Sequence, residues 1–292
     1  MDLAIRLMVQ GLIIGCGYAL IAIGLTMIFG LMDIANFAHG EFFVLGFYFA
    51  FSLAKMFTVF QSVVANYFLG LVIGTLATMA FGVLLDKIVF KRLREEPLLT
   101  ATMATIGLSI FLAYLIQAIW GFWPRQMPTP FGLDPFIWGP FAMPPIRLFI
   151  LVVTGLCIAV FHVLLRRTRL GKAVRATFQN KESAALVGID IDRVYTWTFA
   201  AGAGMAAIAG ILLATIMPMD PPSGGFAVLK AFIVVILGGM GTFTGAIVAG
   251  LGLGVMETLG GGFIASDYKD GFGFLFLILF LLFRPQGIFG EK

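Results

Sequence analysis

The sequence predicts an all-α protein, a polytopic transmembrane bundle of about eight or nine helices. Hydrophobic residues make up 60% of the 292 positions and charged residues only 12%, and the mean hydropathy is +1.03. Soluble domains average roughly 45–50% apolar and about 25% charged residues. A soluble fold of this length could not hide so much apolar surface. The apolar runs are also long and lack the alternation of a membrane barrel, which argues against a sheet.

Each predicted helix is a run of mostly apolar residues, about 20 of which span the hydrocarbon core. The first run is interpreted as a membrane helix rather than a cleaved signal, because only one cation, Arg6, precedes it. The seventh and ninth runs are short for a full crossing, so the count is eight or nine. Residues 1–292 are treated as a single transmembrane domain. The predicted helices cover residues 7–31, 40–60, 63–85, 98–119, 147–165, 194–217, 226–239, 242–258 and 270–283.

The distribution of Lys and Arg predicts the orientation, because cytoplasmic loops carry an excess of both. Segments 86–96 and 166–193 hold 11 of the 19 basic residues, so both are predicted to be cytoplasmic. Segments 120–146 and 218–225 carry one cation between them and are predicted to face outward. Basic residues near the end of the chain place the C-terminus in the cytoplasm. Counting back through the helices places the N-terminus outside.

Segment 30–41 interrupts two strongly apolar runs with four polar residues, Asp33, Asn36, His39 and Glu41. Polar groups and non-helical backbone are tolerated at membrane depth only where they face protein or a water-filled cavity. One interpretation is therefore a broken helix that lines a pathway or packs at its mouth. The other is an ordinary cytoplasmic turn, in which these residues cap the next helix. Both interpretations fit the sequence.

Segment 236–245 is rich in glycine within an otherwise apolar stretch. It has no phosphate-loop Lys and follows a membrane helix, which argues against a nucleotide site. Close helix packing or a discontinuous helix is the better interpretation, and glycines at 250, 252 and 254 extend a small-residue face. The predicted helix-break residues are Gly238, Gly239, Gly241 and Gly245.

Segment 166–193 is the longest well-charged part of the chain. Residues 182–187 are predicted to form a short helix, with Gly188 as its C-cap. A short helix between two membrane helices, with a small apolar face, suits docking into a groove of a soluble partner. A basic loop that lies at the lipid surface explains the same residues equally well.

No cluster of residues in the sequence suggests bond-making chemistry. Paired carboxylates and Ser-His-Asp or Cys-His sets are missing outside the membrane runs, so no enzyme activity is predicted. Cys16 and Cys157 lie in apolar runs without metal-ligand spacing, so neither a metal site nor a disulfide is predicted. No pattern for a cofactor or for nucleic acid is present. Lys230 and Glu257 lie near helix ends, and their charges are expected to reach the membrane interface.

Three motifs, in the expected order, resemble those of the branched-chain amino acid ABC transporter permeases. The first joins residues 24–30 (Gly-Leu-Thr-Met-Ile-Phe-Gly) to residues 36–41 (Asn-Phe-Ala-His-Gly-Glu). The second joins residues 170–176 (Leu-Gly-Lys-Ala-Val-Arg-Ala) to residues 184–188 (Ala-Ala-Leu-Val-Gly). The third is the glycine-rich stretch 230–241. The likeness covers nearly the whole chain and is strongest to the subunit that carries the Asn-Phe-Ala-His-Gly string.

The resemblance implies an importer permease of the bacterial cytoplasmic (inner) membrane that works by alternating access. Its implied partners are a second related permease, two ATP-binding cassette subunits that hydrolyse ATP, and an extracytoplasmic solute-binding protein, besides membrane lipid. Segment 180–190 would be the coupling helix that inserts into a groove of an ATPase. The implied ATPase-coupling residues are Glu182, Ser183, Ala184, Ala185, Leu186, Val187 and Gly188.

A branched-chain amino acid would need apolar walls for its side chain and polar groups for its zwitterionic ends. The only dense polar set in the sequence is Asn36, His39 and Glu41. These three residues are therefore the candidate substrate-pathway residues, with the alternative that they only fix the helix break.

Two departures from the family pattern and three other functions stay open. Asp33 stands where the family usually has an uncharged residue, often glycine, and Asn180-Lys181 replaces a more acidic pair. A permease of the same family could instead carry urea or short amides. An ATP-independent channel or ion-coupled carrier would use Asp33 and Glu41 to relay protons or ions. A membrane-embedded transferase would need convergent catalytic groups at one interface, and the sequence shows none.

Overall fold

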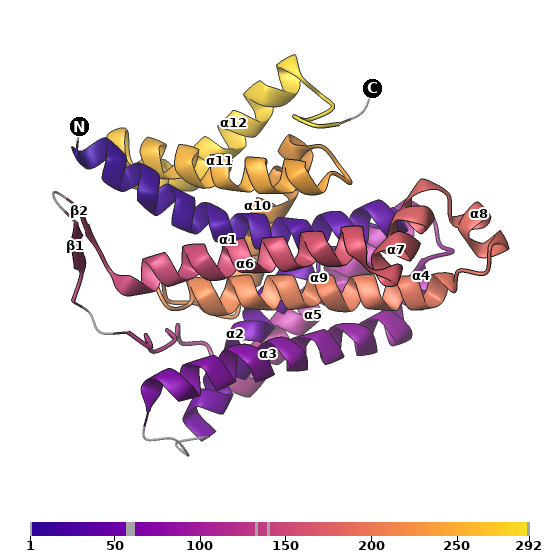
Figure 1. Ribbon diagram of the computed structural model, residues 1–292, viewed down its shortest axis with the longest axis horizontal. Coiled ribbons are helices and arrows are strands. Elements are labelled where there is room, and N and C mark those ends of the chain that lie inside the picture. Colours follow the sequence, from indigo (N-terminus) through magenta and orange to yellow (C-terminus); the bar gives the residue numbers. More distant parts are fainter. Residues whose placement is uncertain (1, 57–61, 132–133, 139–140, 291–292) are drawn as a thin grey trace.

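The computed structural model describes residues 2–56, 62–131, 134–138 and 141–290, and most of this part is helical (Figure 1). A π-helical turn, η1 (Asp86–Phe90), joins α3 to α4, and a 3-10 turn, η2 (Ser266–Tyr268), precedes α12. Two antiparallel strands, β1 (Phe136–Trp138) and β2 (Phe141–Met143), pair between α5 and α6. The α-helices are α1 (Asp2–Met32), α2 (His39–Met56), α3 (Val63–Leu85), α4 (Lys91–Leu93), α5 (Leu98–Trp120), α6 (Pro145–Arg167), α7 (Arg169–Gln179), α8 (Lys181–Leu186), α9 (Ile191–Leu213), α10 (Ser223–Gly238), α11 (Phe243–Phe263) and α12 (Lys269–Phe283).

The prediction of an all-α membrane bundle is confirmed. Six helical units in the described part are long and apolar enough to cross a membrane, namely α1, α3 with its extension to Leu93, α5, α6, α9 and α11. Two further apolar helices, α2 and α10, are shorter. Each of the nine predicted segments contains a helix, with ends that differ by a few residues. The predicted helix over 40–60 is described as far as Met56, and its last residues lie outside the described part.

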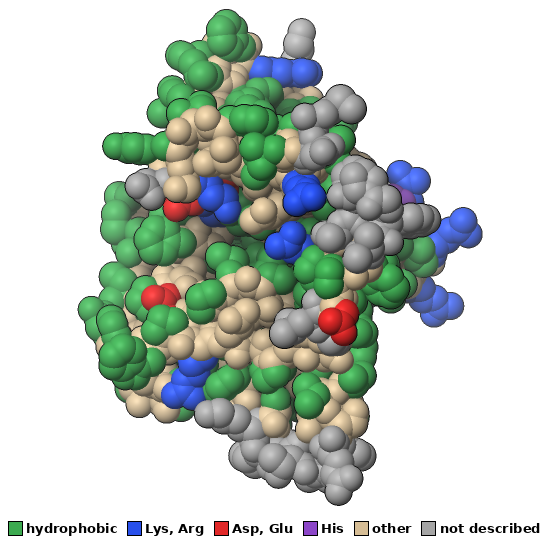
Figure 2. All heavy atoms as spheres, turned by 90° about the vertical axis from the view of Figure 1, so that its left-hand side faces the viewer, with side chains coloured by type: hydrophobic (Ala, Val, Ile, Leu, Met, Phe, Trp, Pro, Cys, Tyr) green, Lys and Arg blue, Asp and Glu red, His purple; other side chains and the backbone are tan. Residues whose placement is uncertain are grey.

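The bundle has two chemically different ends (Figure 1). Segments 86–96 and 166–193, with α4, α7 and α8, lie at one end, which we name the basic end. The N-terminus and the β1–β2 hairpin lie at the other, the N-terminal end, where Figure 2 shows a few charged side chains among hydrophobic ones. The two loops predicted to face outward meet each other, since Arg125 and Met219 exchange two backbone hydrogen bonds of 2.8 Å. The loops thus fall into the two predicted sets, and the side of the membrane stays a prediction.

Two buried helices, α1 and α9, form the centre of the bundle, and α1 packs on α11 through glycine. A Cβ atom at Gly254 would overlap the backbone of α1 at Gly11 and Gly15, and a Cβ atom at Gly250 would lie 2.7 Å from the Cα of Ala19. Direct backbone contact of this kind is how many helices associate in lipid. Gly252 is two residues away from both glycines, on the other side of α11, so its Cβ would meet no atom within 4 Å.

The glycine-rich segment 236–245 forms the tight turn between α10 and α11. Gly239 and Gly241 have φ angles of 98° and 79°, which residues with side chains rarely adopt. The turn brings Gly238 against Gly245, where a Cβ on either residue would overlap the backbone of the other. The four glycines therefore separate α10 from α11 and let the two helices pack closely.

Candidate functional site

Between α1 and α2 the chain turns back into the bundle. Residues 33–38 are not helical, and α2 begins at His39. Thr105 of α5 holds this stretch, because its Oγ1 donates to the Ala35 carbonyl at 2.8 Å and accepts from the Phe37 N–H at 3.3 Å. A side chain of α5 thus satisfies backbone groups that no helix pairs.

His39 places the start of α2 deep inside the bundle. Its Nε2 donates to the carbonyl of Ile21, in the middle part of α1, at 3.1 Å. At about 1.5 Å per residue, Ile21 lies about 16 Å from the end of α1 at Met32, or about half the hydrocarbon thickness. Residues 34–38 therefore form a break between two helices inside the bundle, as in the first interpretation of segment 30–41, whereas Asp33 at its start lies at the surface.

Three buried polar side chains lie at this break, and we name Asn36, His39 and Glu41 the polar layer. Each is at most 1% exposed. Ser109 of α5 donates to Glu41 Oε1 at 3.1 Å. The Asn36 amide, His39 Nδ1 and Glu41 Oε2 make no hydrogen bond within the described part of the chain. Unpaired buried polar atoms cost free energy, so an arrangement or a ligand that supplied partners here would be favoured.

A second helix begins at the level of the polar layer. The first turn of α10 lies against the start of α2, where a Cβ atom at Gly40 would overlap the Gly224 carbonyl. The Glu41 carboxylate lies against the same turn, since a Cβ atom at Gly224 would meet both of its oxygens at 2.7 Å. Helix N-termini carry partial positive charge, so the first turns of α2 and α10 both favour this carboxylate. Helices that begin inside the membrane, with their N-termini directed at a polar group, are typical of transporter midplane sites.

Asp33 lies at the end of α1 and outside the polar layer. Its side chain is 78% exposed, with Oδ2 3.9 Å from the Nζ of Lys181 at the basic end. Its φ of 54° is a left-handed conformation, which glycine adopts most readily and Asp better than most residues. This backbone conformation fits the glycine that the resemblance implies at this position. The channel or carrier alternative would use Asp33 and Glu41 together at membrane depth, but the structure places Asp33 at the exposed end of α1 and Glu41 in the buried polar layer.

Segment 166–193, which was predicted to be the cytoplasmic coupling loop, contains two helices at the basic end, α7 and α8. Asn180 caps α8 by accepting a first-turn N–H at 2.8 Å, and Gly188, with a φ of 84°, follows its last turn. The short helix predicted over 182–187 is thus present, one residue earlier in the chain. Leu186 and Val187 at its tip are 88% and 77% exposed. The remaining coupling candidates are Ala184, which is buried, and Glu182, Ser183 and Ala185, which are exposed.

One aromatic ring on α7 connects the coupling segment to two other predicted sites. The Phe178 ring lies against Gly30 near the end of α1, where a Cβ atom would overlap it. The same ring lies 3.1 Å from the position of a Cβ at Gly241, in the turn between α10 and α11. Close-packed interiors transmit strain, so a displacement of α7 would act on α1 and on this turn together.

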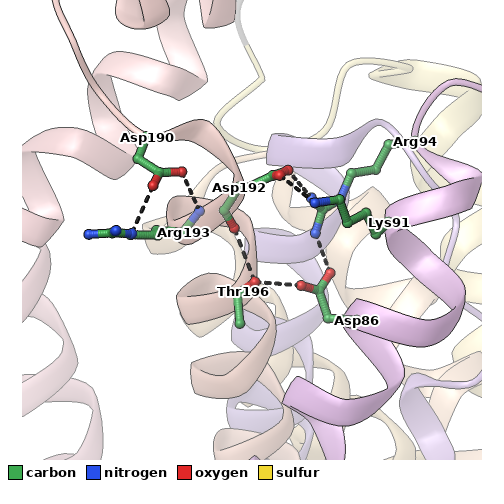
Figure 3. A network of polar contacts seen from close by, with 7 residues as sticks. All are labelled: Asp86, Lys91, Arg94, Asp190, Asp192, Arg193 and Thr196. Carbon is green, nitrogen blue, oxygen red and sulfur yellow. Dashed lines mark hydrogen bonds and ion pairs between the residues drawn. The ribbon is translucent and has the colours of Figure 1, made fainter.

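An ion-pair network ties the two basic loops together (Figure 3). Arg94 donates to Asp192 at 2.8 Å through Nη1 and to Asp86 through Nη2. Asp86 is buried in the π-helical turn η1 and also accepts from Thr196 Oγ1 of α9 at 2.7 Å. Lys91 adds an exposed contact of 2.7 Å to Asp192. The network fixes the beginning of α9, which follows α8 in the chain, to the end of α3.

Replacement of Arg94 by Met is expected to lower stability more than replacement of Lys91 by Met. The first change leaves the buried Asp86 carboxylate without its cation, at a cost of about 1–3 kcal/mol. The second breaks an exposed ion pair, and such pairs contribute about 0–1 kcal/mol. Thermal unfolding of both variants in detergent measures the difference. Equal changes in Tm would show that Arg94 has no special part in the network.

Lys230 and Glu257 are buried and paired with each other, contrary to the expectation that their charges extend away from the bundle to the membrane interface. Lys230 on α10 is 5% exposed and Glu257 on α11 is fully buried, and Nζ lies 2.5 Å from Oε1. Each residue lies on the face by which its helix packs on the neighbouring helix, so the two charges pair inside the bundle. Two isolated residues of opposite charge in consecutive apolar helices were the signal that could have indicated this pair.

Comparison with known proteins shows to which family the chain belongs. A family model described as "Branched-chain amino acid transport system / permease component" matches residues 7–282. The chain belongs to this family. The permease protein LivH of the high-affinity branched-chain amino acid transport system of Salmonella typhimurium is 36% identical over 97% of this chain and 94% of its own length. The corresponding permease protein BraD of Pseudomonas aeruginosa is 35% identical over 97% of this chain and 95% of its own.

A more distant relative is named for the import of a different solute. The autoinducer 2 import system permease protein LsrC of Yersinia enterocolitica is 30% identical over 52% of this chain and 42% of its own length. No solved structure matches the chain. The resemblance inferred from three motifs is confirmed, and this member of the branched-chain amino acid permease family is a multi-pass membrane protein.

Proposed function

We propose that this chain is the permease subunit of an ATP-driven importer for branched-chain amino acids. LivH and BraD, which match nearly its whole length, are named for the transport of these amino acids. In the proposal the chain lies in the bacterial cytoplasmic (inner) membrane, with its basic end and C-terminus in the cytoplasm and its N-terminus outside. It works with a second related permease, two ATP-binding cassette subunits that hydrolyse ATP, and an extracytoplasmic solute-binding protein.

The observation that carries the proposal is the exposed apolar tip of α8. Leu186 and Val187 project from a charged segment at the basic end, where a groove on an ATPase would cover them. From there, Phe178 contacts α1 at Gly30 and the glycine turn at Gly241. These contacts support a mechanical connection from an ATPase to the helices on both sides of the break.

In the proposed cycle the polar layer is the closed level of the pathway. Asn36, His39 and Glu41 are buried between α1, α5 and α10, and several of their polar atoms have no partner in the described part. Motion of α1 against α10 would expose these atoms to the charged ends of a passing amino acid. The substrate would then supply the missing hydrogen bonds during passage.

Uptake of radiolabelled leucine into proteoliposomes tests the proposal. The chain is co-reconstituted with a related permease, two ATPases and a binding protein as the proposed importer requires. We expect uptake only with ATP, and a loss of about tenfold or more in Leu186→Asp, because a carboxylate cannot be solvated in an apolar groove. Leu186→Met is the matched control, since it keeps an apolar side chain of similar volume and should stay near wild type.

Two outcomes would change the proposal in different ways. Uptake that proceeds without the ATPases would favour a channel or an ion-coupled carrier. Uptake of urea or a short amide, but not of leucine, isoleucine or valine, would keep the ATP-driven machine and replace its substrate. Wild-type rates in Leu186→Asp would remove α8 from the coupling role.

A further inference from the structure

A cavity of about 250 Å³ lies in the half of the bundle nearer the N-terminal end. Its lining comes from α1, α2, α9, α10, the segment 217–219 and the start of α12. Most of its wall is apolar, with Ile14, Ile21, Phe43 and Leu213 among the lining residues. The cavity is smaller than the roughly 300–1,000 Å³ of pockets for drug-sized ligands, which suits a ligand as small as an amino acid.

One part of the cavity wall is charged and contains Lys230, Lys269 and Asp270. Lys230 Nζ and Asp270 Oδ1 lie 3.0 Å apart, and both residues line the cavity. Behind them, Glu257 is held on both oxygens, by Lys230 at 2.5 Å and by the Tyr18 hydroxyl at 2.9 Å. The Asp270 side chain, in contrast, is 67% exposed. Glu257 is therefore the internal partner of Lys230, and Asp270 is the accessible one.

A purely structural role does not explain the second carboxylate. Ionisable groups inside a membrane protein are costly, and a buried ion pair adds little net stability. Glu257 alone would neutralise Lys230, so stability does not require Asp270 at the cavity wall. A carboxylate and an ammonium side by side on an apolar cavity are instead complementary to a small ligand that carries both charges.

We propose that this cavity binds the amino acid on its way through the permease, an inference that rests on the proposed function. The Lys230–Asp270 pair holds the zwitterionic end, and the apolar wall holds the aliphatic side chain. The ligand lies along the ion pair in the opposite sense, so that its carboxylate accepts from Lys230 and its ammonium donates to Asp270. Both ligand charges are then paired without any net charge added to the bundle interior.

The position of the cavity fits a binding site that the amino acid occupies before it passes the polar layer. Ile21 lines the cavity and gives its carbonyl to His39 of the polar layer. Ser223, the first residue of α10, lines the cavity too, and its neighbour Gly224 lies against Glu41. An amino acid in the cavity is therefore separated from the basic end by the polar layer.

The test uses the complete transporter in proteoliposomes and compares initial rates of leucine and valine uptake with ATP hydrolysis stimulated by the binding protein. Asp270→Asn keeps the size of the side chain and removes its charge. We expect uptake of both amino acids to fall about tenfold or more, as for the loss of one charged hydrogen bond, while ATP hydrolysis persists. Asp134→Asn, at an exposed carboxylate between α5 and β1, is the matched control and should transport at the wild-type rate.

A second variant tests the apolar wall without changing a charge. Ala227 lines the cavity from α10, so Ala227→Leu reduces the space for the ligand side chain. We expect leucine uptake to fall more than valine uptake, with a change of about tenfold in their ratio, because one methylene in an apolar pocket has an effect of this order. If the Asp270→Asn complex does not assemble, this ratio alone tests whether the cavity binds the amino acid.

The outcomes separate the cavity from the transporter. If the wild type shows ATP-dependent uptake and both cavity variants behave like Asp134→Asn, the cavity assignment is overturned and the importer stands. If the wild type takes up neither leucine nor valine with ATP, the proposed function fails, and the cavity assignment fails with it.

Discussion

We expect the replacement of Lys230 by Met to destabilise the protein by about 3–5 kcal/mol, the usual cost of breaking a buried ion pair from one side. Met preserves much of the volume, but the Glu257 carboxylate would stay fully buried without its cation. The Tyr18 hydroxyl would then be the remaining hydrogen-bond donor to that carboxylate in the described part. Thermal unfolding of the purified protein in detergent measures the change.

The double variant Lys230→Met with Glu257→Gln is the control for this prediction. Gln keeps an acceptor for the Tyr18 hydroxyl and removes the unpaired charge. Replacing both members of a buried pair often costs little, so we expect the double variant to regain most of the lost stability. A double variant as unstable as Lys230→Met would mean that the ion pair is not what the single change disrupts.

Replacement of Gly40 by Ala is expected to abolish leucine uptake by the reconstituted transporter. A Cβ at this position would overlap the Gly224 carbonyl and lie 2.9 Å from the Val228 Cβ. The Gly224 oxygen belongs to a helix backbone and cannot rotate away, so the starts of α2 and α10 would have to separate. Overpacking of this kind typically costs about 1–3 kcal/mol, here at the closed level of the pathway.

Gly155→Ala is the matched control for the Gly40 variant. Gly155 lies inside α6, and a Cβ there would meet no atom within 4 Å. Ala is the better helix former by about 0.8–1.0 kcal/mol, so the control should be neutral or slightly stabilising. Since both changes replace glycine by alanine inside a helix, a loss of uptake in the Gly40 variant alone would report the contact between α2 and α10. Equal behaviour of the two variants would contradict that contact.

The nine predicted helices follow from the apolar runs, because the length and composition of a run are sufficient to predict a membrane helix. The depth at which a helix begins does not follow, since it depends on the partner against which the first turn packs. His39 is an example, because only its hydrogen bond to Ile21 separates a deep break from a surface turn. The depth at which α10 begins could not be predicted either, since nothing in its sequence indicates that Gly224 lies beside Gly40.

The candidate sites show the same division between local and non-local information. The helix near Gly188 was predictable, because a capping residue and a glycine bound it within a few positions. Phe178 was not, because an aromatic residue in a partly exposed helix has many possible neighbours. The pairing of Lys230 with Glu257 and Asp270 joins three helices, α10, α11 and α12, and becomes visible only when those helices are placed.

The late position of α10 in the chain has a consequence for how the protein is made. Glu41 is covered by the first turn of α10, which is synthesised more than half a chain length later. At about 5–20 residues per second, this interval lasts on the order of 10–40 s. Crosslinking of ribosome-arrested chains tests this order. We expect chains that stop before residue 223 to crosslink to the insertion machinery and chains that extend past residue 238 to be released from it. Early release of the shorter chains would refute the prediction. The segment around Glu41 is expected to stay beside the translocon until the first turn of α10 covers it. Synthesis of the C-terminal half therefore sets the time at which the N-terminal half can enter the lipid.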